Sequence, residues 1–168
     1  FYDAHCHPLR YARQLGEPHL LRAPSFTEVF SRITQYHLQN PQCKAIIGRG
    51  WNQNLWQPAQ MPNRQALDAL FPHVPVLLTR IDLHAAVANR AALALAGIDE
   101  HTQIDGGIVE VVNGQTSGLL IDNAVHRVEI ALPSPSEQEF SNQLALAQQH
   151  CFQYGLTSVA DALVTPPD

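Results

Sequence analysis

Four short β-prone runs, separated by segments with helical spacing, constrain the fold of this chain more than any other feature. They comprise residues 1–7, 44–48, 76–80 and 156–162. The run 76–80 (Val-Leu-Leu-Thr-Arg) is mostly apolar, which is typical of a strand covered on both faces. Strands that alternate with helices predict an α/β fold with a parallel sheet. A chain of 168 residues can bury a core of its own, so we predict a single domain over residues 1–168.

Helix signals lie between these runs. Residues 25–28 (Ser-Phe-Thr-Glu) match a capping box, and the apolar residues that follow predict a helix ending near Asn40-Pro41. We expect further helices over about 64–71 and 85–96, and a long helix opened by a second capping box at residues 134–137 and capped by Gly155. The residues after Pro8, up to Pro18, read as a polar loop.

One segment departs from this alternation. Residues 106–112 and 117–122 are both β-prone, and Asn113-Gly114 between them is a strong turn signal. We therefore predict a β-hairpin inserted over about residues 106–122.

Composition excludes several classes of protein. The net charge is −5 and Lys44 is the only lysine, so the chain has no basic stripe of the kind that binds nucleic acid. No apolar run is long enough to span a bilayer, so we expect no membrane partner. The three cysteines show neither zinc-finger spacing nor a disulfide framework. Free thiols are typical of a reducing compartment, and we expect a cytoplasmic location.

The first run carries the sharpest chemical signal, because His5 and His7 stand two residues apart. In a strand these two side chains share one face and Cys6 takes the other. Neutral imidazole is a good ligand for zinc and related metals. Asp3 would lie on the same face and could orient one of the rings. The pair therefore predicts a metal site, with chance placement as the alternative.

Other candidates follow the second and third runs, where α/β proteins place their sites. Trp51 could form the wall of a substrate pocket or pack at the rim of the sheet. Arg80 and His84 are candidates for substrate binding. The alternative for this segment is an ion pair between Arg80 and Asp82, with Asp82 as a helix cap.

Two carboxylates close the set of candidates. Asp122 ends the predicted hairpin, and Asp161 lies within the last β-prone run. A carboxylate in a buried strand is costly unless it is paired or binds metal. Asp161 therefore requires a partner, which could be a metal, an arginine or a backbone donor.

Taken in order, these motifs resemble a known family. The segment 3–7 (Asp-Ala-His-Cys-His) is similar to the first-strand metal motif of the amidohydrolase superfamily. Later segments resemble signatures of the YtcJ-like amidohydrolases (amidohydrolase family 3), namely residues 50–53, 62–64, 80–89, 118–122 and 155–159.

The resemblance implies a TIM-like (β/α) barrel that binds one or two divalent metals, usually zinc, and hydrolyses amide-type, non-peptide C–N bonds of a small-molecule substrate through a metal-activated water. In this scheme His5 and His7 are metal ligands and Asp122 is an additional ligand. Arg80 and His84 correspond to residues on the substrate side.

The same resemblance places the other histidine ligands and the acid/base aspartate on later strands, which we expect beyond residue 168. We therefore expect about half a barrel with parallel strands, inactive by itself, that self-associates through its exposed edges. The alternative is a non-catalytic module that binds a small ligand or a partner.

Overall fold

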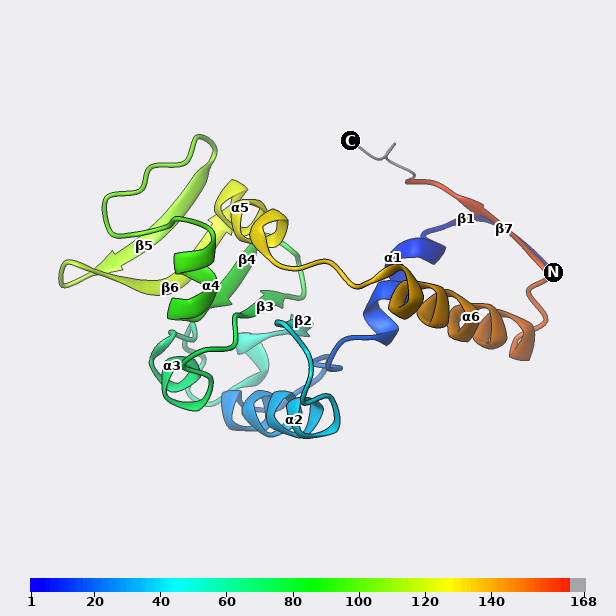
Figure 1. The fold of residues 1–168 in the computed structure, drawn as a ribbon, viewed down its shortest axis with the longest axis horizontal. Coiled ribbons are helices and arrows are strands. Elements are labelled where there is room, and N and C mark those ends of the chain that lie inside the picture. Colours follow the sequence, from blue (N-terminus) through cyan, green and yellow to red (C-terminus); the bar gives the residue numbers. More distant parts are fainter. Residues whose placement is uncertain (164–168) are drawn as a thin grey trace. The chain divides into compact units, whose positions relative to one another are not determined.

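The computed structural model describes residues 1–163, which form two compact units (Figure 1). The terminal unit consists of Phe1–Gly16 together with the residues from Ser134 onward, and the central unit is Glu17–Pro133. The sequence predicted one domain over residues 1–168, whereas each of these units has its own sheet and is described by itself.

The terminal unit is built on two parallel strands, β1 (Tyr2–Cys6) and β7 (Ser158–Asp161). Tyr2 pairs with Ser158 and Asp3 with Val159, so the two ends of the described chain lie side by side. Helices α1 (Pro8–Leu15) and α6 (Glu137–Gln153) pack against each other beside these strands (Figure 1).

Two sequence expectations for this unit are corrected. Residues 8–15 form helix α1 instead of a loop, because Pro8 lies at the first helical position, where its missing N–H costs no hydrogen bond. The capping box of α6 is formed by Ser136 and Glu139, two residues later than predicted. The Ser136 amide donates to the Glu139 carboxylate (2.7 Å), and the Glu139 amide donates to the Ser136 hydroxyl (3.3 Å).

The central unit contains a five-stranded sheet in the order β2-β3-β4-β6-β5. Its strands are β2 (Ile46–Trp51), β3 (Val76–Arg80), β4 (Ala85–Ala88), β5 (Gly107–Val112) and β6 (Gln115–Asp122). Strands β2 and β3 are parallel, and the other neighbouring pairs are antiparallel.

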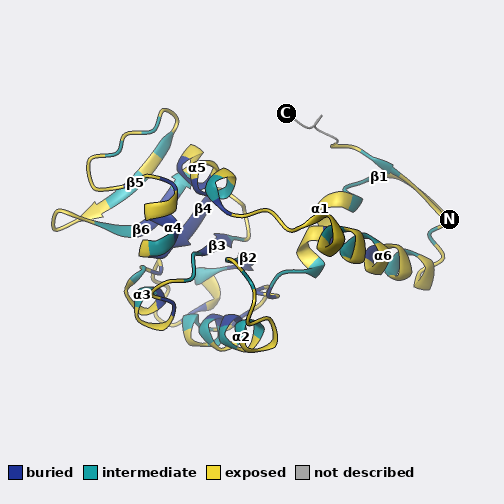
Figure 2. Ribbon diagram, viewed as in Figure 1, coloured by how far each residue is buried: buried dark blue, intermediate teal, exposed yellow. Residues whose placement is uncertain are grey.

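Helices cover both faces of this sheet. They are α2 (Phe26–Gln39), the 3-10 turn η1 (Gln53–Leu55), α3 (Gln65–Leu70), α4 (Arg90–Leu95) and α5 (Asn123–Ala131). Leu78 of β3 packs into one buried cluster with Val29 of α2, and its neighbour Leu77 packs into a second cluster with Val125 of α5. Successive strand residues thus serve opposite faces, and the buried residues gather in the central unit (Figure 2).

The predicted helix over residues 85–96 is wrong in its first half. Residues 85–88 (Ala-Ala-Val-Ala) are all buried and form β4, which returns antiparallel to β3. A short apolar run cannot be assigned to helix or strand from periodicity alone. Asn89 then caps α4, which begins at Arg90. The α/β class with parallel strands is confirmed, while the half-barrel stays a prediction.

The inserted hairpin is confirmed. Val112 and Gln115 face each other across the turn, and both turn residues have positive φ, 52° at Asn113 and 75° at Gly114. This geometry matches the two-residue turns that suit twisted strands. Helix α2 is also confirmed, with the Ser25 hydroxyl accepting from the Glu28 amide at 3.1 Å.

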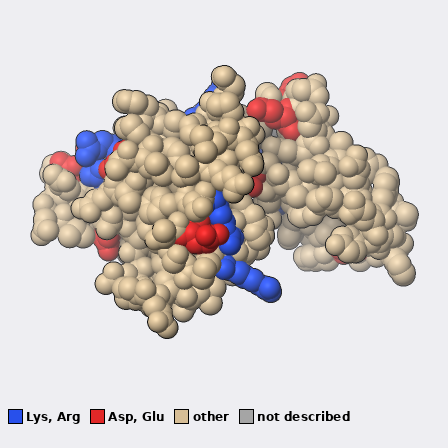
Figure 3. Space-filling model, turned by 90° about the horizontal axis from the view of Figure 1, so that it is seen from below, with Lys and Arg blue, Asp and Glu red and all other residues tan. Residues whose placement is uncertain are grey.

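Charged side chains are few. On the face shown in Figure 3, acidic and basic atoms lie in small groups within a largely uncharged surface. Within residues 1–163, no helix is both long enough and apolar enough to cross a bilayer.

Candidate functional site: a histidine pair and a strand-end cluster

His5 and His7 lie close together at the end of β1. His5 belongs to the strand, and His7 follows it as the N-cap of α1. Their ring centroids are 5.6 Å apart at an interplanar angle of 75°. Asp3 accepts a hydrogen bond from the backbone amide of His5 (3.0 Å), so it fixes the strand rather than a ring.

Asp161 of β7 pairs with Cys6 of β1, and its carboxylate lies near the ring of His7, the residue after Cys6. The distance from His7 Nδ1 to Asp161 Oδ1 is 3.7 Å, longer than a hydrogen bond. Asp161 Oδ1 accepts from the Leu163 amide at 2.9 Å. His7 Nδ1 and Asp161 Oδ2 are both buried and have no hydrogen-bond partner among residues 1–163. Buried polar atoms without partners are costly, so this corner is suited to an additional ligand.

The chemistry of this corner fits part of a metal site. Two imidazoles and a neighbouring carboxylate are donors that zinc and similar metals accept. Among the described residues, no three His, Cys, Asp or Glu side chains come close enough together to hold a metal ion. His5 and His7 therefore fit a site that further ligands would complete.

Cys6 lies between the two histidines in sequence, and its thiol bonds within the strand pair. Its Sγ donates to the carbonyl of Ala160 at 3.4 Å. Desolvation, reinforced by the negative charges of Asp3 and Asp161, raises the pKa of the Cys6 thiol. This shift favours the neutral form of the Cys6 thiol.

A second cluster lies in the central unit where β3, β4 and β6 meet. Arg80 Nε donates to Gln53 Oε1 (2.8 Å), and the Arg80 guanidinium also pairs with Asp82. Asp82 Oδ1 accepts from the His84 amide (3.2 Å), and His84 Nδ1 lies 2.8 Å from Asp122 Oδ1. The segment after β3 and the end of β6 are thus linked into one chain of polar contacts.

The backbone at this cluster is strained. Leu83 has φ of 66° and Asp122 has φ of 50°, both in the left-handed region that side chains other than glycine rarely adopt. The Asp122 amide donates to the His84 carbonyl (2.8 Å), which fixes Asp122 beside His84. Strained residues of this kind cluster at functional sites. The hydrogen bond and the charge of Asp122 raise the pKa of His84, so the pair favours the protonated imidazole.

Trp51 has a different environment. It is the last residue of β2 instead of a loop residue, and it is fully buried. Its indole Nε1 donates to the Leu78 carbonyl (2.7 Å), and its ring stacks on Trp56 at 5.6 Å. Packing, the alternative considered from the sequence, accounts for these contacts, and substrate binding by Trp51 stays a prediction.

The structure therefore groups the candidates in two places. His5 and His7 lie beside Asp161 in the terminal unit, and Arg80 and His84 lie with Asp122 in the central unit. The ligand role of Asp122 stays a prediction.

The pairing of His84 with Asp122 was not predicted. These residues are 38 positions apart and meet because β4 pairs with β6, whereas residues 85–88 were expected to be helical. An available signal was that both residues fall within segments that resemble the same family.

Residues 1–166 match the Amidohydrolase family, and the chain therefore belongs to that family. The chain is 35% identical over 159 residues to the amidohydrolase-like protein YtcJ of Bacillus subtilis (strain 168), covering 94% of this chain and 30% of YtcJ. It is 30% identical over 178 residues to the N-substituted formamide deformylase of Arthrobacter pascens, covering 98% of this chain and 32% of that enzyme.

The fold has relatives of known structure. A metal-dependent hydrolase from Pyrococcus horikoshii OT3, itself uncharacterized, matches 95% of this chain and 30% of its own with a TM-score of 0.70 at 23% identity. This likeness concerns the fold. The chain spans about a third of the length of the curated relatives named above.

Proposed function

We propose that this chain supplies the first two metal ligands of a hydrolase that acts on amide-type C–N bonds of small molecules. The observation that carries the proposal is the His5/His7 pair beside Asp161, where two buried polar atoms have no hydrogen-bond partner in the described part of the chain. Family membership supports hydrolysis. The relative named for deformylation of N-substituted formamides supports a non-peptide amide as the substrate class.

In this proposal His5 and His7 hold a divalent metal, which we take to be zinc. When bound, such a metal polarises a carbonyl and lowers the pKa of water. Asp161 lies beside His7. Its carboxylate would keep the His7 ring in place and would favour a cation bound at this ring.

Arg80 and His84 are proposed to bind polar oxygens of the substrate. Gln53 and Asp82 hold the Arg80 guanidinium, and Asp122 fixes the orientation of the His84 ring. Because the carboxylate of Asp122 has two oxygens, one can remain on His84 while the other binds a metal as an additional ligand.

Zinc binding tests the ligand assignment. In isothermal titration calorimetry, His5→Ala and His7→Ala are each expected to weaken zinc binding by about tenfold or more, because each removes a donor. Asp161→Asn should weaken it by roughly tenfold, as loss of an outer partner does. His101→Ala is the matched control, since the His101 side chain is 86% exposed. Equal zinc affinity in the parent, His5→Ala and His7→Ala proteins would refute the assignment.

Activity is a separate test. The whole protein with zinc is expected to hydrolyse an N-substituted formamide, to lose this activity in a chelator and to regain it when zinc is restored. Full activity in the chelated protein would sink the metal-dependent mechanism.

We also propose self-association through the edge of the central sheet. Strand β5 is an edge strand, and Ile108, Val111 and Val112 on it are 59%, 43% and 51% exposed. Exposed apolar edges pair readily with other chains. Sedimentation velocity should show a dimer that Val111→Lys abolishes. The control Leu38→Lys, at an exposed position of α2, should leave the dimer intact. A monomer at all concentrations would contradict this.

A further inference from the structure

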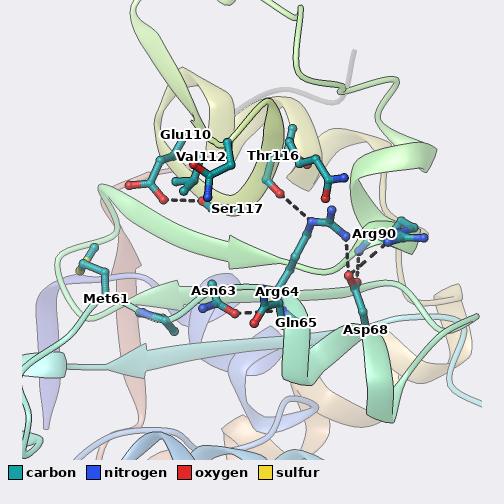
Figure 4. Close-up of a pocket in the computed structure, with 13 residues that line it drawn as sticks. Met61, Asn63, Arg64, Gln65, Asp68, Arg90, Glu110, Val112, Thr116 and Ser117 are labelled. Carbon is teal, nitrogen blue, oxygen red and sulfur yellow. Dashed lines mark hydrogen bonds and ion pairs between the residues drawn. The ribbon is translucent and has the colours of Figure 1, made fainter.

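The central unit has a second place suited to a small molecule. A pocket of about 690 Å³ lies between the hairpin of β5 and β6, the segment before α3, and α4 (Figure 4). This volume is typical of ligand sites. Its hairpin wall includes Gln115–Ser117 at the start of β6, whereas Asp122 ends the same strand, roughly 20 Å away at 3.4 Å per residue. The pocket therefore lies away from the His84–Asp122 pair.

One side of the pocket is basic. Arg64 Nε donates to the Thr116 carbonyl (2.7 Å), and its guanidinium pairs with Asp68. Asp68 also accepts from the Arg90 amide (2.6 Å). The Arg64 side chain is only 12% exposed and its charge is compensated, so its role is to join the hairpin to α3.

Arg90 is the available cation on this side. Its side chain is 76% exposed, and its one ion-pair contact among the described residues is 4.0 Å long, from Nε to Asp68 Oδ2. Asp68 is thus shared between two guanidinium groups, which leaves a net positive charge. An arginine in this position is suited to bind a carboxylate in a bidentate manner.

The opposite side of the pocket is acidic. Glu110 projects from β5, and its carboxylate accepts from the Ser117 hydroxyl. Among the described residues, no ion pair includes Glu110, and its negative charge is therefore available to a ligand. Figure 4 shows Glu110 and Ser117 at one side, with Arg64, Asp68 and Arg90 at the other.

The pocket also has apolar lining. Met61 and Val112 both line the pocket. Two arginines and two carboxylates give the lining a formal charge of zero, with the free charges at separate sides. A ligand that carries both charges matches this pattern better than a simple anion or cation.

We propose that this pocket binds a small zwitterion, an amino-acid derivative or short peptide, with its carboxylate on Arg90 and its ammonium on Glu110. Met61 and Val112 offer apolar contact to short aliphatic side chains. This site involves none of the residues assigned to metal or substrate above, so it goes beyond the proposed hydrolase and stands independently of it.

Three tripeptide probes separate the two charges. Trialanine has both, N-acetyl-trialanine lacks the ammonium, and trialanine amide lacks the carboxylate. Binding to the 168-residue chain is followed by amide chemical-shift titration. Trialanine is expected to bind at least five times more tightly than either single-charge probe, with shifts concentrated at residues 61–68 and 110–117. Equal affinities for the three probes, or shifts outside the pocket, would overturn the proposal.

Variants assign each charge to its side chain. Arg90→Gln should weaken the binding of trialanine at least fivefold and leave the affinity for trialanine amide unchanged. Glu110→Gln should weaken the binding of trialanine by a similar factor and leave the affinity for N-acetyl-trialanine unchanged. Lys44→Gln and Glu100→Gln, both exposed and outside the pocket, are the matched charge controls. Arg90→Lys should retain most of the affinity. If the controls weaken binding as much as the pocket variants, or if neither pocket variant weakens it, the site is refuted.

Discussion

Of the buried polar residues that the structure describes, Asn89 is the one whose replacement should lower the free energy of unfolding most. It is fully buried, and its amide makes four hydrogen bonds to backbone. Its Oδ1 accepts from the amides of Val76 (2.9 Å) and Ala92 (3.0 Å). Its Nδ2 donates to the carbonyls of Phe71 (2.8 Å) and Val74 (2.8 Å). Asn89 thereby joins the end of α3, the start of β3 and the start of α4.

The size of the loss follows from this geometry. Asn89→Ala removes four bonds, each of which contributes about 1 kcal/mol net. It also leaves the Val76 and Ala92 amides without these partners in the interior. We expect a decrease in the free energy of unfolding of about 4 kcal/mol, a large share of the roughly 5–15 kcal/mol of an ordinary domain.

Urea unfolding followed by tryptophan fluorescence measures this loss. Trp51 and Trp56 both lie in the core of the central unit and report on the unit that contains Asn89. Asn40→Ala is the matched control, because Asn40 is exposed and its side chain donates a hydrogen bond to the Tyr36 carbonyl. This variant should lower the free energy of unfolding by at most about 0.5 kcal/mol. If Asn89→Ala costs no more than Asn40→Ala, the hydrogen-bond reasoning is refuted.

Two further predictions concern the same unit. Gly118→Ala should lower the free energy of unfolding by about 3 kcal/mol, because φ is 90° and a Cβ there would lie 2.5 Å from the Ala88 carbonyl oxygen. Gly114 has φ of 75° and open space around it, so Gly114→Ala should lower it by about 1 kcal/mol. Equal losses of the two variants in urea unfolding would contradict this. The Thr102 hydroxyl bond lowers the pKa of Asp99 below its ordinary 3.8, so Asp99 stabilises the fold above that pH and the contribution disappears as pH falls through the lowered pKa. The difference in melting temperature between parent and Asp99→Asn should therefore shrink below pH 3.8, and a constant difference from pH 7 to pH 3 would exclude this role.

Local signals predicted local structure well. Asn113-Gly114 predicted the hairpin, and Ser25 with Glu28 predicted the start of α2. These signals act within a few residues, through turn geometry and capping bonds. The same local signals misjudged residues 85–88, because an all-apolar run is compatible with a buried strand and with a buried helix.

Sequence alone determined the family, the order of most elements and the histidine pair on the first strand, since these depend on residue type and short-range spacing. Only the tertiary structure decided which distant residues meet. The pairing of β1 with β7 brings Asp161 to His7, and the pairing of β4 with β6 brings Asp122 to His84. The burial of Trp51 was likewise decided by packing. Strand pairing and burial depend on which apolar faces cover one another, and periodicity within a single segment carries no record of that choice.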